Sequence, residues 1–175
     1  MTSRMRHARQ PIGLTLAGSD SGGGAGLQAD LKTFAALSVY GTSVVTCLTA
    51  QNPKAVLESF PVPASMVRAQ LDALWSELPP RAVKSGMLYN AEIIQVLADF
   101  WKSTVGSRGR PAKRGGKIPL VVDPVMMATS GASLLRPDAV AALELVALVV
   151  SVALQVDSVA LQDSQVVRWV ATSVK

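Results

Sequence analysis

Glycines and short polar side chains follow an apolar run near the start of the chain, within residues 14–30, LTLAGSDSGGGAGLQAD. The apolar run predicts a strand, and the residues after the glycines predict a helix. Glycine admits backbone conformations closed to other residues and lets a ligand approach the main chain, so this turn suits a small polar ligand. A turn that binds nothing would explain the glycines, but less readily the polar groups crowded around it, which are Ser19, Asp20, Ser21, Gln28 and Asp30.

Two common nucleotide-binding motifs compete for this turn. A P-loop ends in Gly-Lys-Ser/Thr, and the first lysine after these glycines is Lys32, inside the predicted helix, which excludes a P-loop. A dinucleotide fingerprint is formally present at 24–29, GAGLQA, but it needs an acidic residue at the end of a second strand. Residues 46–52 contain no acid, so the dinucleotide interpretation remains a minor alternative.

Candidate functional residues also stand where three later apolar segments end: Gln51, Gly86 with Met87, and Asp123. If these segments are parallel strands, their carboxyl ends meet at the edge where open α/β sheets bind ligands. Gln51 offers one acceptor and two donors, enough to read the edge of an aminopyrimidine, although polar residues also commonly end strands. Taken alone, Met87 would be a core residue and Asp30 a solvated carboxylate in the first turn of a helix, whereas Asp123 could equally end a strand before proline or hold a metal at the strand end.

Predicted strands and helices alternate along the chain and must position these candidate residues. Apolar and β-branched runs predict strands over 11–17, 41–50, 81–88 and 118–123, with a short strand or flap over 56–61. Apolar residues at helical spacing predict helices over 25–37, 63–78, 91–101 and 137–148, the third of them capped by Asn90. This alternation predicts one α/β unit with a mainly parallel sheet and helices on both faces.

The composition excludes several classes of function. Cys47 is the only cysteine, so an internal disulfide is impossible, and we expect a buried strand cysteine in a cytoplasmic protein. His7 is the only histidine, which excludes a histidine-based triad or metal cluster. Residues 139–156 are apolar, but Glu144 interrupts them and favours a buried segment over a membrane span.

The net charge of +5 is concentrated in two segments. Nine of the 17 basic residues lie in 1–10 and 102–117, which contain no acid, so the rest of the chain is mildly acidic. Neither segment interleaves aromatic residues with its charges. We therefore expect a solvated basic tail and a flexible basic insertion, and no nucleic-acid-binding surface.

Four segments, in this order and at these separations, resemble the hydroxymethylpyrimidine and phosphomethylpyrimidine kinases of thiamine biosynthesis, in the ribokinase-like superfamily. They are 14–30, 40–52 (YGTSVVTCLTAQN), 83–88 (VKSGML) and 121–131 (VVDPVMMATSG). The resemblance extends from about 12 to 148. It implies a ribokinase-like three-layer α/β/α fold with a mainly parallel sheet, incomplete at its C-terminal side.

The resemblance also implies a reaction, its cofactors and a set of site residues. The reaction is ATP-dependent phosphorylation of 4-amino-5-hydroxymethyl-2-methylpyrimidine and then of its monophosphate, with ATP and Mg²⁺ as cofactors. Gln51 and Asp30 would hold the pyrimidine, and Gly18 would border it. Met87 and Val125 would pack on its ring. Asp123 is the expected magnesium residue, because phosphoryl transfer depends on positioning and on neutralising the charge of the transferred group. Relatives often dimerise, so a homodimer is a further expectation.

The resemblance ends near Leu148. The family continues with a Thr-Pro-Asn-Leu-Pro-Glu-Ala stretch and then a Gly-Thr-Gly-Cys motif that supplies the catalytic residue, and neither occurs here. We therefore expect the N-terminal half of a kinase domain over 11–148, a divergent tail over 149–175, no catalytic residue and impaired turnover. Two alternatives remain: a fragment that binds a pyrimidine or a subunit without turnover, and a pyridoxal-type kinase. The glycine-rich run argues against the pyridoxal-type kinase.

Overall fold

The computed structural model describes residues 10–106 and 118–123, together with Val125, Leu134, Arg136 and Ala139. These residues contain one five-stranded sheet with strand order β3-β2-β1-β4-β5. Its strands are β1 (Ile12–Gly18), β2 (Tyr40–Asn52), β3 (Ala55–Pro61), β4 (Ala82–Ser85) and β5 (Leu120–Val122). Only the β2–β3 pair is antiparallel, so the predicted mainly parallel sheet is confirmed.

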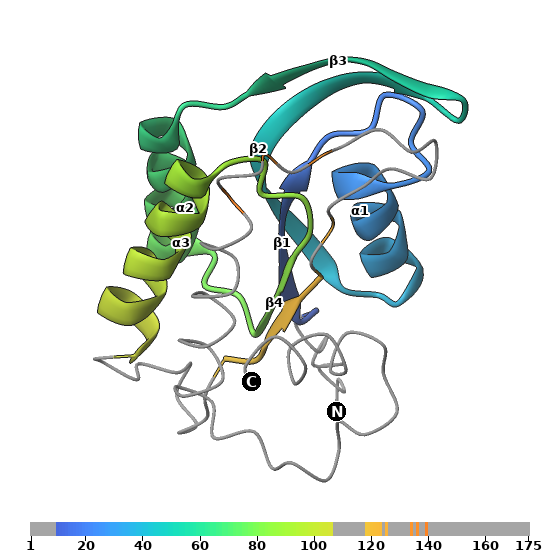
Figure 1. The fold of residues 1–175 in the computed structure, drawn as a ribbon. Helices are drawn as coiled ribbons and strands as arrows, with labels where there is room; N and C mark the ends of the chain where they lie inside the picture. The colour runs from blue at the N-terminus through green and yellow to red at the C-terminus, as the bar shows by residue number, and fades with distance from the viewer. Residues whose placement is uncertain are drawn as a thin grey trace, which may run out of the picture.

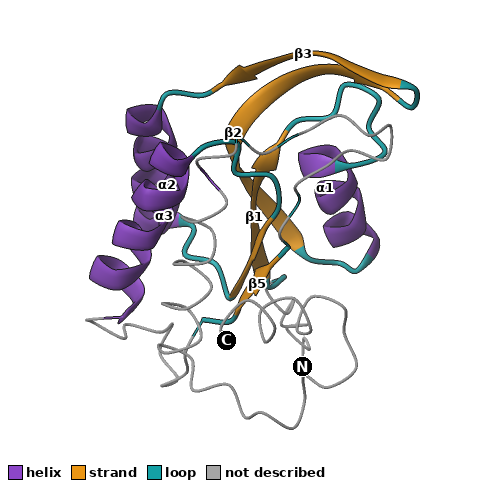
Figure 2. Cartoon of the chain, viewed as in Figure 1, coloured by secondary structure: helices purple, strands orange, loops and turns teal. Residues whose placement is uncertain are grey.

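Helices cover both faces of this sheet, as the alternation of elements predicts. They are α1 (Gly26–Ala36), α2 (Ala64–Glu77) and α3 (Ala91–Phe100), and α3 continues into a π-helical segment, η1 (Trp101–Gly106). Helix α1 lies on one face, whereas α2 and α3 lie side by side on the other (Figures 1 and 2). The described part of the chain is therefore a three-layer α/β/α structure.

Strand β1 lies in the middle of the sheet, and helices cover both of its faces. Six of its seven residues are buried, as expected for a parallel strand between two helical layers. Side chains alternate between the faces of a strand. Leu14 and Leu16 join the core beneath α2 and α3, whereas the hydroxyl of the intervening Thr15 bonds a side chain of α1. The sequence of β1 thus supplies an apolar layer on one side and a polar position on the other.

The main hydrophobic core lies between the sheet and the α2–α3 layer. Its largest fully buried side chains include Leu14, Leu16, Leu71, Ile93, Ile94, Leu97 and Phe100. Helix α3 begins where the sequence predicts, since the Asn90 Oδ1 accepts a hydrogen bond of 2.9 Å from the Ile93 backbone N–H. This cap satisfies one of the donors that every helix leaves unpaired in its first turn.

Some predicted segments differ from the structure or lie outside the described residues. The predicted third strand, over 81–88, ends at Ser85, although the Gly86 N–H still donates to the Leu16 carbonyl of β1 at 2.8 Å. Residues 102–106, the start of the predicted basic insertion, are helical, while 107–117 lie outside the described residues. So do residues 1–9, most of the predicted helix over 137–148, and the tail over 149–175. Every helix in the described part of the chain is too short or too polar to cross a bilayer.

Candidate functional site

A pocket of about 260 Å³ lies at the carboxyl ends of the parallel strands. Helix α1 follows β1 on one face of the sheet and α3 follows β4 on the other, so the β1–β4 boundary is a topological switch point, where such sheets bind ligands. This volume lies just below the usual range for small-molecule sites, which begins at about 300 Å³, and it suits a ligand with one ring. All six residues implied by the resemblance line this pocket: Gly18, Asp30, Gln51, Met87, Asp123 and Val125.

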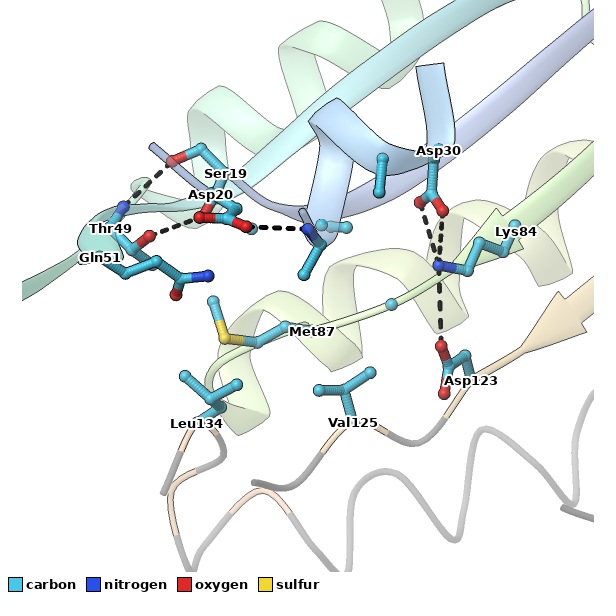
Figure 3. Close-up of a pocket in the computed structure, with 16 residues that line it drawn as sticks. Ser19, Asp20, Asp30, Thr49, Gln51, Lys84, Met87, Asp123, Val125 and Leu134 are labelled. Atoms are coloured by element: carbon cyan, nitrogen blue, oxygen red, sulfur yellow. Dashed lines mark hydrogen bonds and ion pairs between the residues drawn. The ribbon is translucent and has the colours of Figure 1, made fainter. Parts of the chain in front are cut away.

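Gly18 and Met87 form one wall through close contact. Gly18 ends β1, and a Cβ built on it would overlap the Met87 Cε, so glycine leaves the space that the methionine side chain occupies. Met87 is 7% exposed, and its carbonyl accepts a hydrogen bond of 2.6 Å from the Thr46 hydroxyl. The apolar side chains of Met87, Val125 and Leu134 gather on one side of the pocket (Figure 3). This side can pack against a flat ring.

Asp20 organises the glycine-rich turn. Asp20 is 5% exposed, and its carboxylate accepts hydrogen bonds from the backbone N–H groups of Gly22 at 2.8 Å, Gly24 at 2.9 Å and Ala25 at 2.8 Å. Burial by itself would raise the pKa of Asp20, but these bonds and the Gln51 side chain favour the charged form, so its pKa lies below the ordinary value. These backbone N–H groups therefore donate to a carboxylate of the protein itself and not to a bound phosphate.

The loop after β1 is tied to the far end of β2 by side chains that replace strand hydrogen bonds. The Ser19 hydroxyl accepts from the Thr49 N–H at 3.0 Å, and the Thr49 hydroxyl donates to the Ser19 carbonyl at 2.7 Å. The Ser21 hydroxyl accepts from the Gln51 N–H at 2.8 Å and donates to the Gln51 carbonyl at 2.6 Å. A register shift between Ala50 and Gln51 marks a bulge, a feature that redirects side chains, and the Gln51 amide points into the pocket (Figure 3).

Asp30 and Asp123 meet around a lysine that the sequence analysis did not single out. The Lys84 Nζ lies 2.9 Å from the Asp30 Oδ1 and 3.7 Å from the Asp123 Oδ2. Asp30 also accepts a hydrogen bond of 2.6 Å from the Thr15 hydroxyl. One feature of the sequence could have pointed to this lysine. Lys84 is the single charged residue of the short strand 82–85, and its two neighbours, Val83 and Ser85, are buried.

Asp123 fits the magnesium role implied by the resemblance. Its side chain is 46% exposed at the end of β5, and Mg²⁺ is commonly held by one or two carboxylates together with phosphates and water. Lys84 approaches the Oδ2 atom, and among the described residues Oδ1 has no hydrogen-bond or ion-pair partner, so Oδ1 is the oxygen suited to a cation. In the described part of the chain, histidine, cysteine and carboxylate side chains form no cluster of three that could hold a metal by itself. A metal here would take most of its ligands from phosphate and water.

Cys47 is buried, as its β-branched surroundings predict, and lies next to the pocket wall. It is 0% exposed, and burial raises the pKa of its thiol to about 11. Because the thiolate is the reactive form, we expect the native protein not to react with a thiol reagent near neutral pH. The urea-unfolded chain should take up one equivalent, at its single cysteine. Stoichiometric labelling of the native protein at a comparable rate would contradict this burial.

Comparison with known proteins gives concordant matches to kinases. The profile of the phosphomethylpyrimidine kinase family matches residues 20–154. The hydroxymethylpyrimidine/phosphomethylpyrimidine kinase of Rhizobium meliloti is 57% identical over 132 residues, which are 75% of this chain and 45% of that protein. The protein of the same name from Bacillus subtilis is 47% identical over 131 residues, 75% of this chain and 44% of that protein.

Solved structures agree with these matches. The crystal structure of phosphomethylpyrimidine kinase from Clostridium difficile has a TM-score of 0.65 and 43% identity, covering 77% of this chain and 54% of that one. The pyridoxal kinase from Staphylococcus aureus in complex with AMP-PCP has a TM-score of 0.55 and 32% identity, covering 70% of this chain and 41% of that one. The chain thus spans about half the length of the curated relatives that it matches.

Proposed function

The chain belongs to the phosphomethylpyrimidine kinase family, and from this premise we propose that its pocket binds 4-amino-5-hydroxymethyl-2-methylpyrimidine and its monophosphate for phosphorylation by ATP in thiamine biosynthesis. The similarity to two kinases also confirms the ribokinase-like fold class. One observation carries the proposal: six residues from the four segments of the resemblance line a single pocket at the topological switch point. The kinase relatives, one of them in complex with AMP-PCP, support the use of ATP.

The polar groups of the pocket are suited to a ring with amino and hydroxyl donors. Gln51 can pair with a ring nitrogen and an exocyclic amine at once, because its amide both donates and accepts. Asp30 supplies an acceptor at the other side of the pocket. Met87 and Val125 supply apolar contacts for the ring faces. Together these contacts would fix the orientation of the ring and hence of its hydroxymethyl group.

The acidic character of the pocket supports a position for the phosphates at its rim. Asp30 lies inside, with its side chain 16% exposed, whereas Asp123 stands more open at the end of β5. Asp123 would hold a magnesium ion, which neutralises phosphate charge when bound. In this arrangement the hydroxyl of the pyrimidine faces the phosphate to be transferred, and positioning lowers the barrier to transfer. The prediction that the chain lacks a catalytic residue stays a prediction.

Binding of the pyrimidine without nucleotide tests the proposal most directly, since it needs only the pocket. We expect titration calorimetry to detect one site, and Gln51→Ala to weaken binding by about tenfold, the usual effect of losing well-placed hydrogen bonds. Gln95→Ala is the matched control, because Gln95 lies on the exposed surface of α3, where it bonds Asp99. It should leave the affinity unchanged. A folded protein that does not bind the pyrimidine would contradict the proposal.

Two further readouts complete this experiment. Pyridoxal is the competing ligand, because structures of pyridoxal kinase resemble this chain. Tighter binding of pyridoxal than of the pyrimidine would favour the pyridoxal-type alternative. An ADP-release assay with ATP and magnesium measures whether the chain also turns over. The cytoplasmic location, the homodimer and the absence of nucleic-acid binding stay predictions.

A further inference from the structure

An ammonium group stands between two of the carboxylates that line the pocket, those of Asp30 and Asp123. The Lys84 Nζ donates to both oxygens of Asp30, at 2.9 Å and 3.0 Å, and lies 3.7 Å from the Asp123 Oδ2. The three side chains come from α1, β4 and the residue after β5, and Figure 3 shows the lysine pointing between the two acids. Lys84 thus occupies the place where a bridging cation would join Asp30 to Asp123.

The register of the β1–β4 pair directs the Lys84 side chain toward Asp30. Lys84 pairs with Thr15 in the parallel β1–β4 ladder, so the two side chains share one face of the sheet, the face covered by α1. Val83 lies in the opposite core, as alternation along the strand requires. A half-buried lysine is unfavourable without a partner, and the two acids supply the compensating charge.

The hydrogen bonds of Asp30 leave one acceptor position open. Oδ2 accepts from the Thr15 hydroxyl at 2.6 Å and from Lys84 at 3.0 Å, whereas Oδ1 accepts only from Lys84 among the described residues. Each carboxylate oxygen can accept about two hydrogen bonds. Oδ1 of this pocket-lining residue therefore keeps a lone pair for a donor on the ligand. Without the ammonium, the charges of Asp30 and Asp123 would be uncompensated, and only the Thr15 hydroxyl would still orient the Asp30 carboxylate.

We propose that Lys84 is a positioning residue for ligand binding: it holds the Asp30 carboxylate with Oδ1 directed toward an amino or hydroxyl donor of the ring. The same ammonium bridges Asp30 to the more exposed Asp123, which leaves the inner acid to serve the ring and the outer acid to serve the phosphate end. This inference rests on the proposed function, because it assigns Lys84 to the pocket that takes the pyrimidine.

A double-mutant cycle on pyrimidine binding tests the inference. We expect Lys84→Met to weaken binding by about tenfold, since charge-assisted hydrogen bonds orient Asp30. Asp30→Asn should weaken it at least as much. Because Lys84 acts through Asp30, the double variant should bind no more weakly than Asp30→Asn alone. The matched control is Lys54→Met, at the exposed β2–β3 turn, which should bind like the unaltered chain.

The outcomes separate this inference from the proposed function. If the unaltered chain does not bind the pyrimidine, both fail. If it binds but Lys84→Met binds within about twofold of it, or the losses from the two single variants add, only the role of Lys84 is overturned. Circular dichroism establishes that each variant is folded. If Lys84→Met does not fold, Lys84→Gln, which keeps a neutral donor, takes its place in the same cycle.

Discussion

Replacing Gly26 by alanine is expected to lower the free energy of unfolding by about 3 kcal/mol, from the positive φ together with an overlap against rigid backbone. Gly26 has φ +55°, and a Cβ there would overlap the carbonyl oxygen of Gly18. A carbonyl held in a buried strand end cannot move aside as a flexible side chain can. Urea denaturation followed by circular dichroism measures the loss as a lower midpoint.

Gly24→Ala is the matched control in the same turn. The nearest atom to a Cβ at this position is the Asp20 Oδ2, at 3.9 Å, and the Gly24 φ is not positive. Alanine also keeps the N–H that donates to Asp20. The stability should therefore change by no more than about 0.5 kcal/mol. Equal stabilities for the two variants would mean that α1 does not start as close to β1 as the structure places it.

Removing the carboxylate of Asp20 is expected to lower the free energy of unfolding by about 2 kcal/mol, since three donors lose their acceptor but water can reach part of the turn. Asp20→Ala leaves the N–H groups of Gly22, Gly24 and Ala25 without this partner. Thermal or urea unfolding near neutral pH measures the loss. Asp72→Ala is the control, because Asp72 pairs with Arg68 at 2.9 Å on the exposed surface of α2. It should change stability by less than about 0.5 kcal/mol.

The contribution of Asp20 has a defined pH dependence. Hydrogen bonding to the charged form outweighs burial and lowers the pKa of Asp20 in the folded protein. The stabilisation is therefore complete above the pKa of an unfolded aspartate, about 4, and is lost as the pH falls through the lower folded value. The stability difference between the unaltered chain and Asp20→Ala should be constant from neutral pH to about 5 and shrink below about 4. A difference that grows on acidification would contradict this assignment.

The sequence predicted where the pocket lies because strand ends are marked by residue type. Gln51 precedes Asn52 and Pro53, and Asp123 precedes a proline, so each stands where a central ladder must stop. The carboxyl ends of parallel strands share one edge, which brings such residues together without knowledge of side-chain contacts. Lys84 was missed because its place depends on the register of the strands. Only the pairing of Thr15 with Lys84 shows that the lysine faces α1 and Asp30, and register is a tertiary property.

The glycine-rich turn shows a second limit of the sequence. Its composition correctly predicts a strand-to-helix turn, and the exclusion of a P-loop agrees with the structure, where Asp20 takes the backbone donors. Yet Asp20 and Asp30 look alike in the sequence, as acids beside the same glycines. Asp20 stabilises the turn by accepting backbone hydrogen bonds, whereas Asp30 lines the pocket and pairs with Lys84. The difference depends on which backbone groups converge in space.

The central place of β1 has a consequence for synthesis on the ribosome. One edge of β1 pairs with residues 40–47, but the other waits for residues 82–85, which are made after β2, β3 and α2. Until then the nascent chain presents an apolar strand with an open edge, the kind of surface that associates with other chains or recruits a chaperone. The arrival of β4 closes this edge and carries Lys84 to Asp30 in the same step. The ligand pocket is therefore completed at the same stage of synthesis at which the exposed edge of β1 is covered.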